Sequence, residues 1–334
     1  MIDQRVLPRK VEFVLCSTLE DMVLAITNMA IRGAPALAVA AAYGMVLAVQ
    51  DSKSNIRSKA NHAAKVLIQS RPTAVNLGWG VKRILRLVEN QAISEVELPV
   101  LMLAEAHRMA EEDVTINRRL SENGASLIED GDTIIHHCNT GALAVVDWGT
   151  ALGTIRFAHE QGKHIHVLVD ETRPRLQGAR LTAWECEQYG IPYEIITDNA
   201  AGYFLRSGKV QKVFFGADRV AANGDVVNKV GSYMLSLAAH ANKVPVYSVF
   251  PLSTVDMSIA NGDLIPIEER DPDEVLGISF HGEPVAPINA KAKNPAFDVT
   301  PHNLLSGLVT EAGIITSPIG QKLASLVYNS SLDG

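Results

Sequence analysis

The chain has 334 residues, of which 47% are hydrophobic and 20% charged, and its formal net charge is −7 at pH 7. This length predicts one large domain or two smaller ones, and the composition excludes a largely disordered chain. The mild acidity excludes an extended basic surface for nucleic acid or an anionic membrane, so a phosphate ligand would need a local cluster of basic side chains.

Cysteine usage and the apolar runs indicate a cytoplasmic protein without a membrane segment. Cys16, Cys138 and Cys186 form no C-x-x-C pair, and their odd number argues against a disulfide framework, as expected in a reducing cytosol. The first residues, MIDQRVLPRK, lack the apolar stretch of a secretory signal. The most apolar run, ALAVAAAYGMVLAV (36–49), is too short to span a bilayer and is interpreted as a buried helix.

The first third of the chain has the periodicity of helices. In STLEDMVLAITNMA (17–30), apolar residues recur at i, i+3 and i+4, and Thr18 with Asp21 resembles a capping box. Gly33 and Pro35 interrupt this pattern before the apolar run. Further helical patterns occupy about 57–69, 77–90 and 96–122. These patterns predict a mostly helical N-terminal domain.

From about residue 130, short β-branched runs alternate with helical patterns. The strand patterns are DTIIHH, HIHVLVD, IPYEIIT, KVFFGAD and VPVYSVF. This alternation predicts an α/β fold with a largely parallel, doubly wound, Rossmann-like sheet that is covered by helices on both faces. We therefore predict a mainly helical domain over residues 1–122 and a Rossmann-like domain over residues 123–334.

Polar residues follow four of these strand patterns. The segments are HHCNTGALAV (136–145), DETRP (170–174), TDN (197–199) and GADR (216–219). Ligands of open parallel sheets bind beyond the carboxyl ends of the strands, so these segments should face one crevice. Neither G-x-G-x-x-G nor a Walker A sequence follows a strand, so there is no fingerprint for a dinucleotide or nucleotide.

Two residues at these strand ends are candidates for catalysis. Cys138 precedes a turn or helix start. Three interpretations of this position are open: a nucleophile, a proton shuttle or a small buried residue without a chemical role. Asp218 ends an apolar strand, where its carboxyl group can act as a general acid, cap a helix or pair with Arg219. A metal site that includes His136 and His137 is disfavoured, because neighbouring residues of a strand point to opposite faces.

Several residues are candidates for binding an anion. Arg32 in RGAPA and Arg71 in SRPTAVN lie in turns of small residues between helices, where an arginine needs a phosphate or an internal carboxylate as partner. Asn228 and Lys229 lie at an expected helix start, where an anion is favoured, although a solvated lysine is the common case. Gln177, in LQGAR, lies at another expected helix start.

Together these segments resemble the methylthioribose-1-phosphate isomerases. The matching segments, in order over residues 2–315, are RGAPA, SRPTAVN, HCNTGALA, DETRPRLQGARLTAWE, GADRVAANGDVVNKVG, PLSTVDMSIANGDLIPIEER and NPAFDVTP. The resemblance implies an aldose–ketose isomerase of methionine salvage that converts 5-methylthioribose 1-phosphate into 5-methylthioribulose 1-phosphate. It also implies a homodimer that needs no metal and no organic cofactor.

The resemblance also assigns residues. It implies that Cys138 and Asp218 are the catalytic pair. It implies that the ligand contacts are Arg32, Gly33, Ala34, Arg71, Gln177, Asn228 and Lys229. Phosphate on the anomeric oxygen prevents the ring from opening as a free hemiacetal, so we assign protonation of the ring oxygen to Asp218. We assign hydrogen transfer between C2 and C1 to Cys138, with direct hydride transfer as the alternative route.

Relatives in the same superfamily provide the alternative functions. Related isomerases with the same catalytic pair act on ribose 1,5-bisphosphate or 5-deoxyribose 1-phosphate. Regulatory subunits of the guanine-nucleotide exchange factor of translation initiation bind partners and perform no sugar chemistry. The presence of both Cys138 and Asp218 favours an enzyme. The chain departs from the isomerase pattern in its short leader and at Asp147–Trp148, where a glycine-containing stretch is more common.

Overall fold

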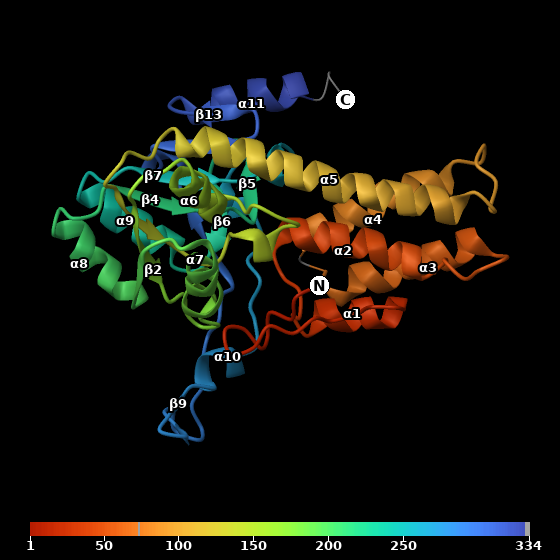
Figure 1. Cartoon of the computed structure of the whole chain (residues 1–334), viewed down its shortest axis with the longest axis horizontal. Coiled ribbons are helices and arrows are strands. Elements are labelled where there is room, and N and C mark those ends of the chain that lie inside the picture. The colour runs from red at the N-terminus through yellow and green to blue at the C-terminus, as the bar shows by residue number, and fades with distance from the viewer. Residues whose placement is uncertain (73, 331–334) are drawn as a thin grey trace. The chain divides into compact units, whose positions relative to one another are not determined.

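The computed structural model describes residues 1–72 and 74–330, which divide into two compact units (Figure 1). Unit 1 comprises residues 1–117 and 141–149. Unit 2 comprises residues 118–140 and the described residues from 150 onward. The chain therefore leaves unit 2 shortly after Cys138 and returns to it at Thr150.

Unit 1 is built from helices, as predicted. They are α1 (Leu19–Thr27), α2 (Ala34–Leu47), α3 (Ile56–Ser70), α4 (Val75–Glu89) and α5 (Leu98–Ala125), whose last residues belong to unit 2. The predicted capping box of α1 is confirmed: Asp21 N donates to Thr18 Oγ1 at 3.1 Å, and Thr18 N donates to Asp21 Oδ2 at 3.0 Å. The predicted boundary after residue 122 falls inside α5 and stays a prediction.

The segment 141–149 packs against the helical part of unit 1. Gln4 Nε2 donates to the Leu143 carbonyl at 2.7 Å, and Val146 N donates to Asp113 Oδ2 at 2.7 Å. A Cβ atom on Gly33, whose φ is +103°, would lie 2.1 Å from the Ala144 carbonyl oxygen. Only glycine fits this approach, so Gly33 has a structural reason to be in RGAPA apart from any ligand.

Unit 2 contains a seven-stranded sheet with the order β13-β12-β7-β4-β1-β2-β3. Its strands are β1 (Thr133–His136), β2 (His166–Asp170), β3 (Tyr193–Ile196), β4 (Lys212–Phe215), β7 (Val246–Val249), β12 (Gly307–Thr310) and β13 (Gly313–Ile315). All neighbours are parallel except β12 and β13. The strand order reverses between β1 and β4, which confirms the predicted Rossmann-like, doubly wound sheet.

Helices cover both faces of this sheet. They are α6 (Ala151–Glu160), α7 (Ala183–Tyr189), α8 (Ala201–Arg206), α9 (Ser232–Ala241) and α11 (Ile319–Ser330). Ile135 and Phe215 share one hydrophobic cluster with residues of α8 and α9. Their strand neighbours Ile134 and Phe214 are also fully buried and point to the opposite face. Burial of both faces explains why these strands are continuous apolar runs.

A second sheet of unit 2 has the order β11-β6-β5-β8. Its strands are β5 (Arg219–Ala221), β6 (Val226–Lys229), β8 (Val255–Asp256) and β11 (Phe297–Thr300). The predicted helix start at Asn228 and Lys229 is wrong, because these residues end β6 and α9 begins at Ser232. Antiparallel pairing of β6 with β5 and with the distant β11 determines their conformation.

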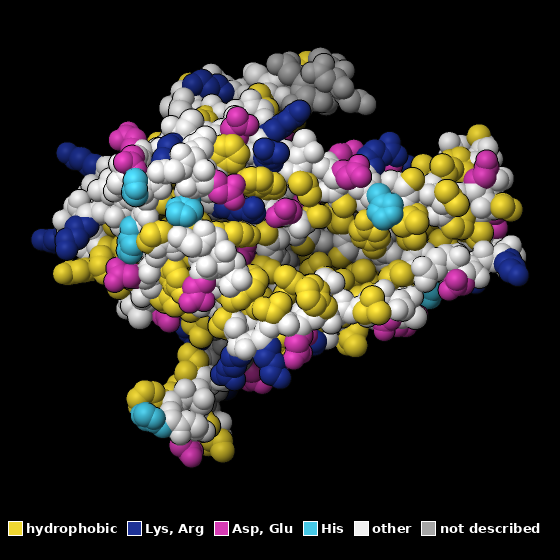
Figure 2. Space-filling model, viewed as in Figure 1, with side chains coloured by type: hydrophobic (Ala, Val, Ile, Leu, Met, Phe, Trp, Pro, Cys, Tyr) yellow, Lys and Arg dark blue, Asp and Glu magenta, His cyan; other side chains and the backbone are white. Residues whose placement is uncertain are grey.

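The remaining short elements and the surface complete the fold. Helix α10 (Asp273–Leu276) precedes the small hairpin of β9 (Ser279–Phe280) and β10 (Glu283–Pro284). Figure 2 shows hydrophobic side chains among the surface residues of the helices of unit 1. In residues 1–72 and 74–330, no helix combines the length and apolar character that crossing a bilayer requires.

Candidate active site

The two predicted catalytic residues follow neighbouring strands of the large sheet. Cys138 comes two residues after β1, and Asp218 lies between β4 and β5. Strands β1 and β4 are paired in parallel, with His136 opposite Phe214. A Cβ atom on Gly216 would lie 2.9 Å from Thr140 Cγ2, so the two loops also approach each other closely. Cys138 and Asp218 thus lie at the switch point of the sheet, where ligands of such folds bind.

Cys138 is buried and has an unusual backbone conformation. Its φ is +69°, in the left-handed region that costs a non-glycine residue about 1 kcal/mol. The loop is fixed from both sides, since Cys138 N donates to Thr172 Oγ1 at 2.9 Å and Thr182 Oγ1 donates to the Cys138 carbonyl at 2.7 Å. Such tertiary contacts can maintain a strained residue, and strained residues occur often at functional sites.

Hydrogen bonds join the segments that follow β1, β2 and β3. Asp198, in the turn after β3, accepts from the backbone N–H groups of Thr172 and Arg173, both at 2.7 Å. Thr172 in turn accepts from Cys138 N. These contacts confirm that the strand-end segments lie together at one edge of the sheet.

Asp218 lies where the two sheets of unit 2 meet. It is half-buried, and its backbone N–H donates to the Val227 carbonyl at 2.8 Å. Its alternative role as a helix cap is wrong, because the next element is strand β5. Arg219, the other alternative partner, faces Asp256, with 3.9 Å between Arg219 Nε and Asp256 Oδ2.

Lys229 brings a buried cation close to both catalytic candidates. It is 8% exposed, and its Nζ donates to the Ala296 carbonyl at 2.6 Å. Burial lowers the pKa of Lys229, and the negative charges of Cys138 and Asp218 act against this effect. The expectation of a solvated lysine is therefore wrong. Its neighbour Asn228 is also buried and donates from Nδ2 to Ser232 Oγ at 2.7 Å.

The N-terminus of α9 is already capped by an internal carboxylate. Asp298 accepts from Gly231 N at 2.7 Å and from Tyr233 N at 3.1 Å. Burial raises the pKa of Asp298, and these two hydrogen bonds oppose that rise. An anion is therefore not needed to satisfy these amides, in contrast to what the sequence suggested for this helix start.

The other predicted ligand contacts divide between the two units. Gln177 is buried in unit 2, directly before the π-helical turn Gly178–Thr182. A Cβ atom on Gly178 would lie 1.7 Å from the Asp170 carbonyl oxygen, so this turn packs closely against the end of β2. The predicted contacts in unit 1 are Arg32, Gly33, Ala34 and Arg71.

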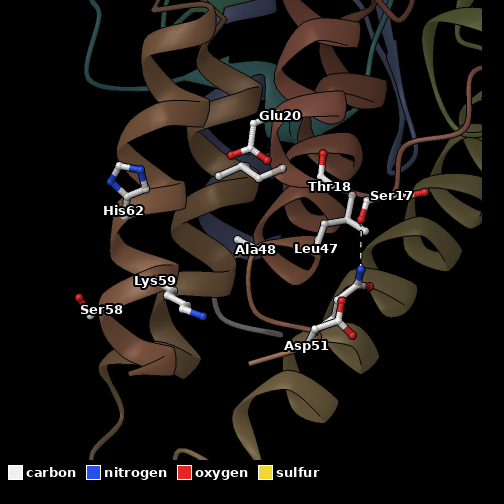
Figure 3. Close-up of a pocket in the computed structure, with 11 residues that line it drawn as sticks. Ser17, Thr18, Glu20, Leu47, Ala48, Asp51, Ser58, Lys59 and His62 are labelled. Carbon is white, nitrogen blue, oxygen red and sulfur yellow. Dashed lines mark hydrogen bonds between the residues drawn. The ribbon is translucent and has the colours of Figure 1, made fainter. Parts of the chain in front are cut away.

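Unit 1 also has a hollow of about 520 Å³ that contains none of the predicted site residues (Figure 3). Residues of α1, α2, α3 and their flanking loops line it, among them Glu20, Lys59 and His62. Lys59 Nζ is engaged with Ser52 Oγ at 2.7 Å. Nothing in this hollow resembles the strand-end chemistry of unit 2.

Curated relatives match nearly the whole chain. A family model described as the initiation factor 2 subunit family matches residues 30–317. A methylthioribose-1-phosphate isomerase of Synechococcus sp. is 46% identical over 333 residues, which cover 98% of this chain and 95% of the relative. Methylthioribose-1-phosphate isomerase 2 of Pseudothermotoga lettingae is 48% identical over 328 residues, covering 98% and 94%.

Two crystal structures share the fold. The 5-methylthioribose 1-phosphate isomerase from Pyrococcus horikoshii OT3 is 40% identical with a TM-score of 0.91, covering 99% of this chain and 93% of that one. A protein from A. fulgidus, described as translation initiation factor eIF-2B subunit delta, is 41% identical with a TM-score of 0.88, covering 98% and 96%. The chain belongs to the initiation factor 2 subunit family and, within it, to the methylthioribose-1-phosphate isomerases.

Proposed function

We propose that the chain converts 5-methylthioribose 1-phosphate into 5-methylthioribulose 1-phosphate, the aldose–ketose isomerisation of methionine salvage. One observation carries the assignment of residues. Cys138 and Asp218 follow neighbouring strands at the switch point of the sheet, and the buried Lys229 interacts electrostatically with both. Relatives at 46% and 48% identity that bear the isomerase name support the reaction.

The first step opens the ring. Asp218 donates its proton to the ring oxygen while the bond between this oxygen and C1 breaks. The Cys138 thiolate removes the proton from C2, and the electrons of that C–H bond form the C1–C2 double bond. The product is an enol phosphate with a hydroxyl group on C2. The Lys229 cation stabilises the thiolate before this step and the Asp218 carboxylate that forms during it.

The second step forms the ketose. The C2 hydroxyl returns a proton to the Asp218 carboxylate as the C2 carbonyl forms, and C1 takes the proton from the Cys138 thiol. Both residues return to their starting states, so the sequence balances without an oxidant or reductant. The alternative route moves a hydride from C2 to C1 and leaves Cys138 only to shape the pocket.

Substrate binding is part of the same proposal. Lys229 supplies positive charge for the phosphate. Arg32 and Arg71 stay predicted phosphate contacts. Gln177 and Asn228 provide amide groups for sugar hydroxyls. The predicted contacts at Gly33 and Ala34 are backbone contacts.

A non-catalytic role in translation initiation is the second candidate. It is favoured by the A. fulgidus protein, which is 41% identical and is described as an initiation factor subunit. A purely regulatory subunit would have no use for a strained cysteine and a carboxyl group at the switch point. An activity assay therefore separates the two candidates.

The assay offers three substrates to the purified protein: 5-methylthioribose 1-phosphate, ribose 1,5-bisphosphate and 5-deoxyribose 1-phosphate. Ketose formation is measured for each. We expect the highest kcat/KM with 5-methylthioribose 1-phosphate. A higher value with one of the other two sugars would reassign the substrate, and no turnover of any of them would refute the isomerase.

The homodimer and the cytoplasmic location are also proposals. Exposed hydrophobic side chains on α9, namely Tyr233, Met234 and Leu237, provide a surface that a second copy of the chain could cover. Light scattering after gel filtration tests the dimer, and a monomeric mass at micromolar concentration would contradict it.

A further inference from the structure

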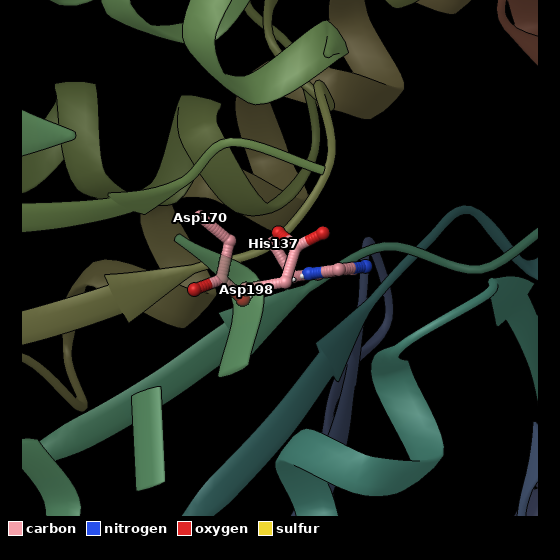
Figure 4. A group of neighbouring side chains, drawn as sticks. All are labelled: His137, Asp170 and Asp198. Atoms are coloured by element: carbon pink, nitrogen blue, oxygen red, sulfur yellow. Dashed lines mark hydrogen bonds and ion pairs between the residues drawn. The ribbon is translucent and has the colours of Figure 1, made fainter. Parts of the chain in front are cut away.

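His137 is a fully buried histidine whose two ring nitrogens both face oxygen atoms. Its side chain is 1% exposed. Nδ1 lies 2.8 Å from Asp170 Oδ2, and Nε2 lies 3.0 Å from the Val230 carbonyl oxygen. Figure 4 shows the ring beside Asp170, from the end of β2, and Asp198, from the turn after β3.

These contacts determine the protonation state of the ring. A carboxylate and a carbonyl oxygen only accept hydrogen bonds, so both ring nitrogens must carry a proton for both bonds to form. Burial lowers the pKa of His137, but the hydrogen bond and the charge of Asp170, with the charge of Asp198, outweigh it and raise that pKa overall. Burial raises the pKa of Asp170 to about 6 against the opposing effect of His137. The raised pKa of His137 therefore agrees with its two hydrogen bonds, which require a protonated ring.

Three carboxylates near the ring favour an imidazolium. The carboxylates of Asp170, Asp198 and Asp298 interact with it from β2, from the turn after β3 and from β11. The neighbouring His136 is fully buried too, and burial lowers its pKa to about 3, so it is neutral. His137 is thus the cation of a local cluster of carboxylates.

A metal ion is the competing explanation for this cluster. Ligand atoms of His137, Asp170 and Asp198 lie within 4.8 Å of one another. However, both Asp198 oxygens accept backbone hydrogen bonds at 2.7 Å, and His137 Nδ1 lies at direct hydrogen-bond distance, 2.8 Å, from Asp170 Oδ2. The donor set therefore favours an ion pair.

The position of the ring in the chain gives the ion pair a consequence for catalysis. His137 directly precedes Cys138, and Val230 directly follows Lys229. The loop after β6 also packs on the ring edge, because a Cβ atom on Gly231 would lie 2.8 Å from His137 Cε1. The buried His137 side chain thus links the backbone beside Cys138, the proposed base, to the backbone beside Lys229.

We propose that His137 is a positioning residue for the isomerisation: bound to Asp170 and to the Val230 carbonyl as a buried cation, it fixes the backbone of Cys138 relative to that of Lys229. This inference rests on the proposed function for its kinetic consequence. The protonation state does not depend on that function and can be measured separately.

The protonation state is measured by NMR on protein with ¹⁵N-labelled histidine at pH 8, with His137→Gln to assign the signals. We expect two ring N–H signals for His137. A single ring N–H signal, or an ordinary titration of this ring near its usual pKa, would overturn the buried cation. Loss of one N–H signal on adding Zn²⁺ would overturn it in favour of the metal site.

The positioning role is measured with a matched pair of variants, His137→Gln and His136→Gln. Both replace a fully buried histidine in or beside β1. Misplacement of a reacting group typically costs about 10²-fold, so we expect His137→Gln to lower kcat by about 10- to 100-fold with little change in KM. We expect His136→Gln to lose stability while keeping kcat per folded molecule.

Asp170→Asn provides a second variant that keeps the volume of the site. We expect it to remove one ring proton of His137 and to lower kcat as His137→Gln does. Unchanged kcat in either folded variant would overturn the positioning role. If the wild type turns over no sugar phosphate, the proposed function fails. The NMR result still decides whether His137 is a buried cation.

Discussion

The two sheets of unit 2 contribute to the candidate site in different ways. The seven-stranded sheet is parallel, and its strand ends place Cys138 and Asp218 at the switch point. The four-stranded sheet is largely antiparallel and brings Lys229 to the same place by pairing β6 with the distant β11. The proposed proton-transfer groups thus come from a local strand-end pattern, whereas the buried lysine comes from long-range pairing.

The largest expected effect concerns the parallel sheet. General acid–base groups typically contribute about 10²- to 10⁴-fold, so Cys138→Ser and Asp218→Asn should each lower kcat on 5-methylthioribose 1-phosphate by that factor. Cys186→Ser is the matched control, because burial raises the pKa of this thiol to about 12 and makes it inert. Full activity in Cys138→Ser would remove the proton-transfer role from Cys138.

The next effect concerns the loop after β6. Gly231→Ala should lower the free energy of unfolding by about 3 kcal/mol. The φ of Gly231 is +107°, which disfavours any side chain, and the added Cβ atom would lie 2.8 Å from His137 Cε1. Gly190→Ala, with φ +67° and open space at Cβ, should cost only about 1 kcal/mol. Urea denaturation measures both, and equal losses would show that the ring does not pack tightly on this loop.

A smaller effect is expected for the charge that the small sheet supplies. Lys229→Met should lower kcat/KM by about 10- to 100-fold, the size of one lost charge-assisted hydrogen bond. Lys212→Met is the control, because this lysine begins β4 and pairs with Asp132 at 2.6 Å, at the other end of the strand from Asp218. If both variants keep the wild-type kcat/KM, the small sheet has no part in substrate binding.

The smallest effect concerns the ion pairs near Lys229. Glu274 binds Arg270 at 2.6 Å and Arg175 at 2.9 Å, and these contacts lower its pKa to about 2 although burial opposes them. A carboxyl group with a lowered pKa stabilises the fold above its ordinary pKa, and the benefit is lost as the pH falls toward 2. Glu274→Gln should therefore cost about 1 kcal/mol at pH 7 and almost nothing at pH 2. Denaturation of wild type and variant at both pH values tests this, with the exposed Glu283→Gln as control. If the stability difference between wild type and Glu274→Gln were as large at pH 2 as at pH 7, the ion pairs would be excluded as its cause.

The same contrast explains what the sequence could predict. The helices of unit 1 follow from apolar spacing and from the Thr18 capping box, which are local signals. The edge that carries Cys138 follows from strand alternation and the strand-end rule. The conformation of Asn228 and Lys229 depends on pairing with β11, which no local pattern reveals, so a helix start was expected where a strand ends.

The role of His137 was missed for a related reason. The strand-end rule already placed HHCN and DETRP at one edge, so a contact between His137 and Asp170 was within reach of the sequence. The second contact, to the Val230 carbonyl, requires the position of the loop after β6. Only both contacts together define the imidazolium, which is why the sequence disfavoured a metal site and left these histidines without a role.

The most direct test of the central claim is the reaction of 5-methylthioribose 1-phosphate in D₂O, followed by NMR for the wild type and for Cys138→Ser. We expect the wild type to form the ketose with deuterium at C1, and we expect the variant to form it at least about 10²-fold more slowly. Ketose that retains all of the C2 hydrogen at C1, formed at equal rates by both proteins, would contradict proton transfer by Cys138. Absence of ketose would contradict the isomerase itself.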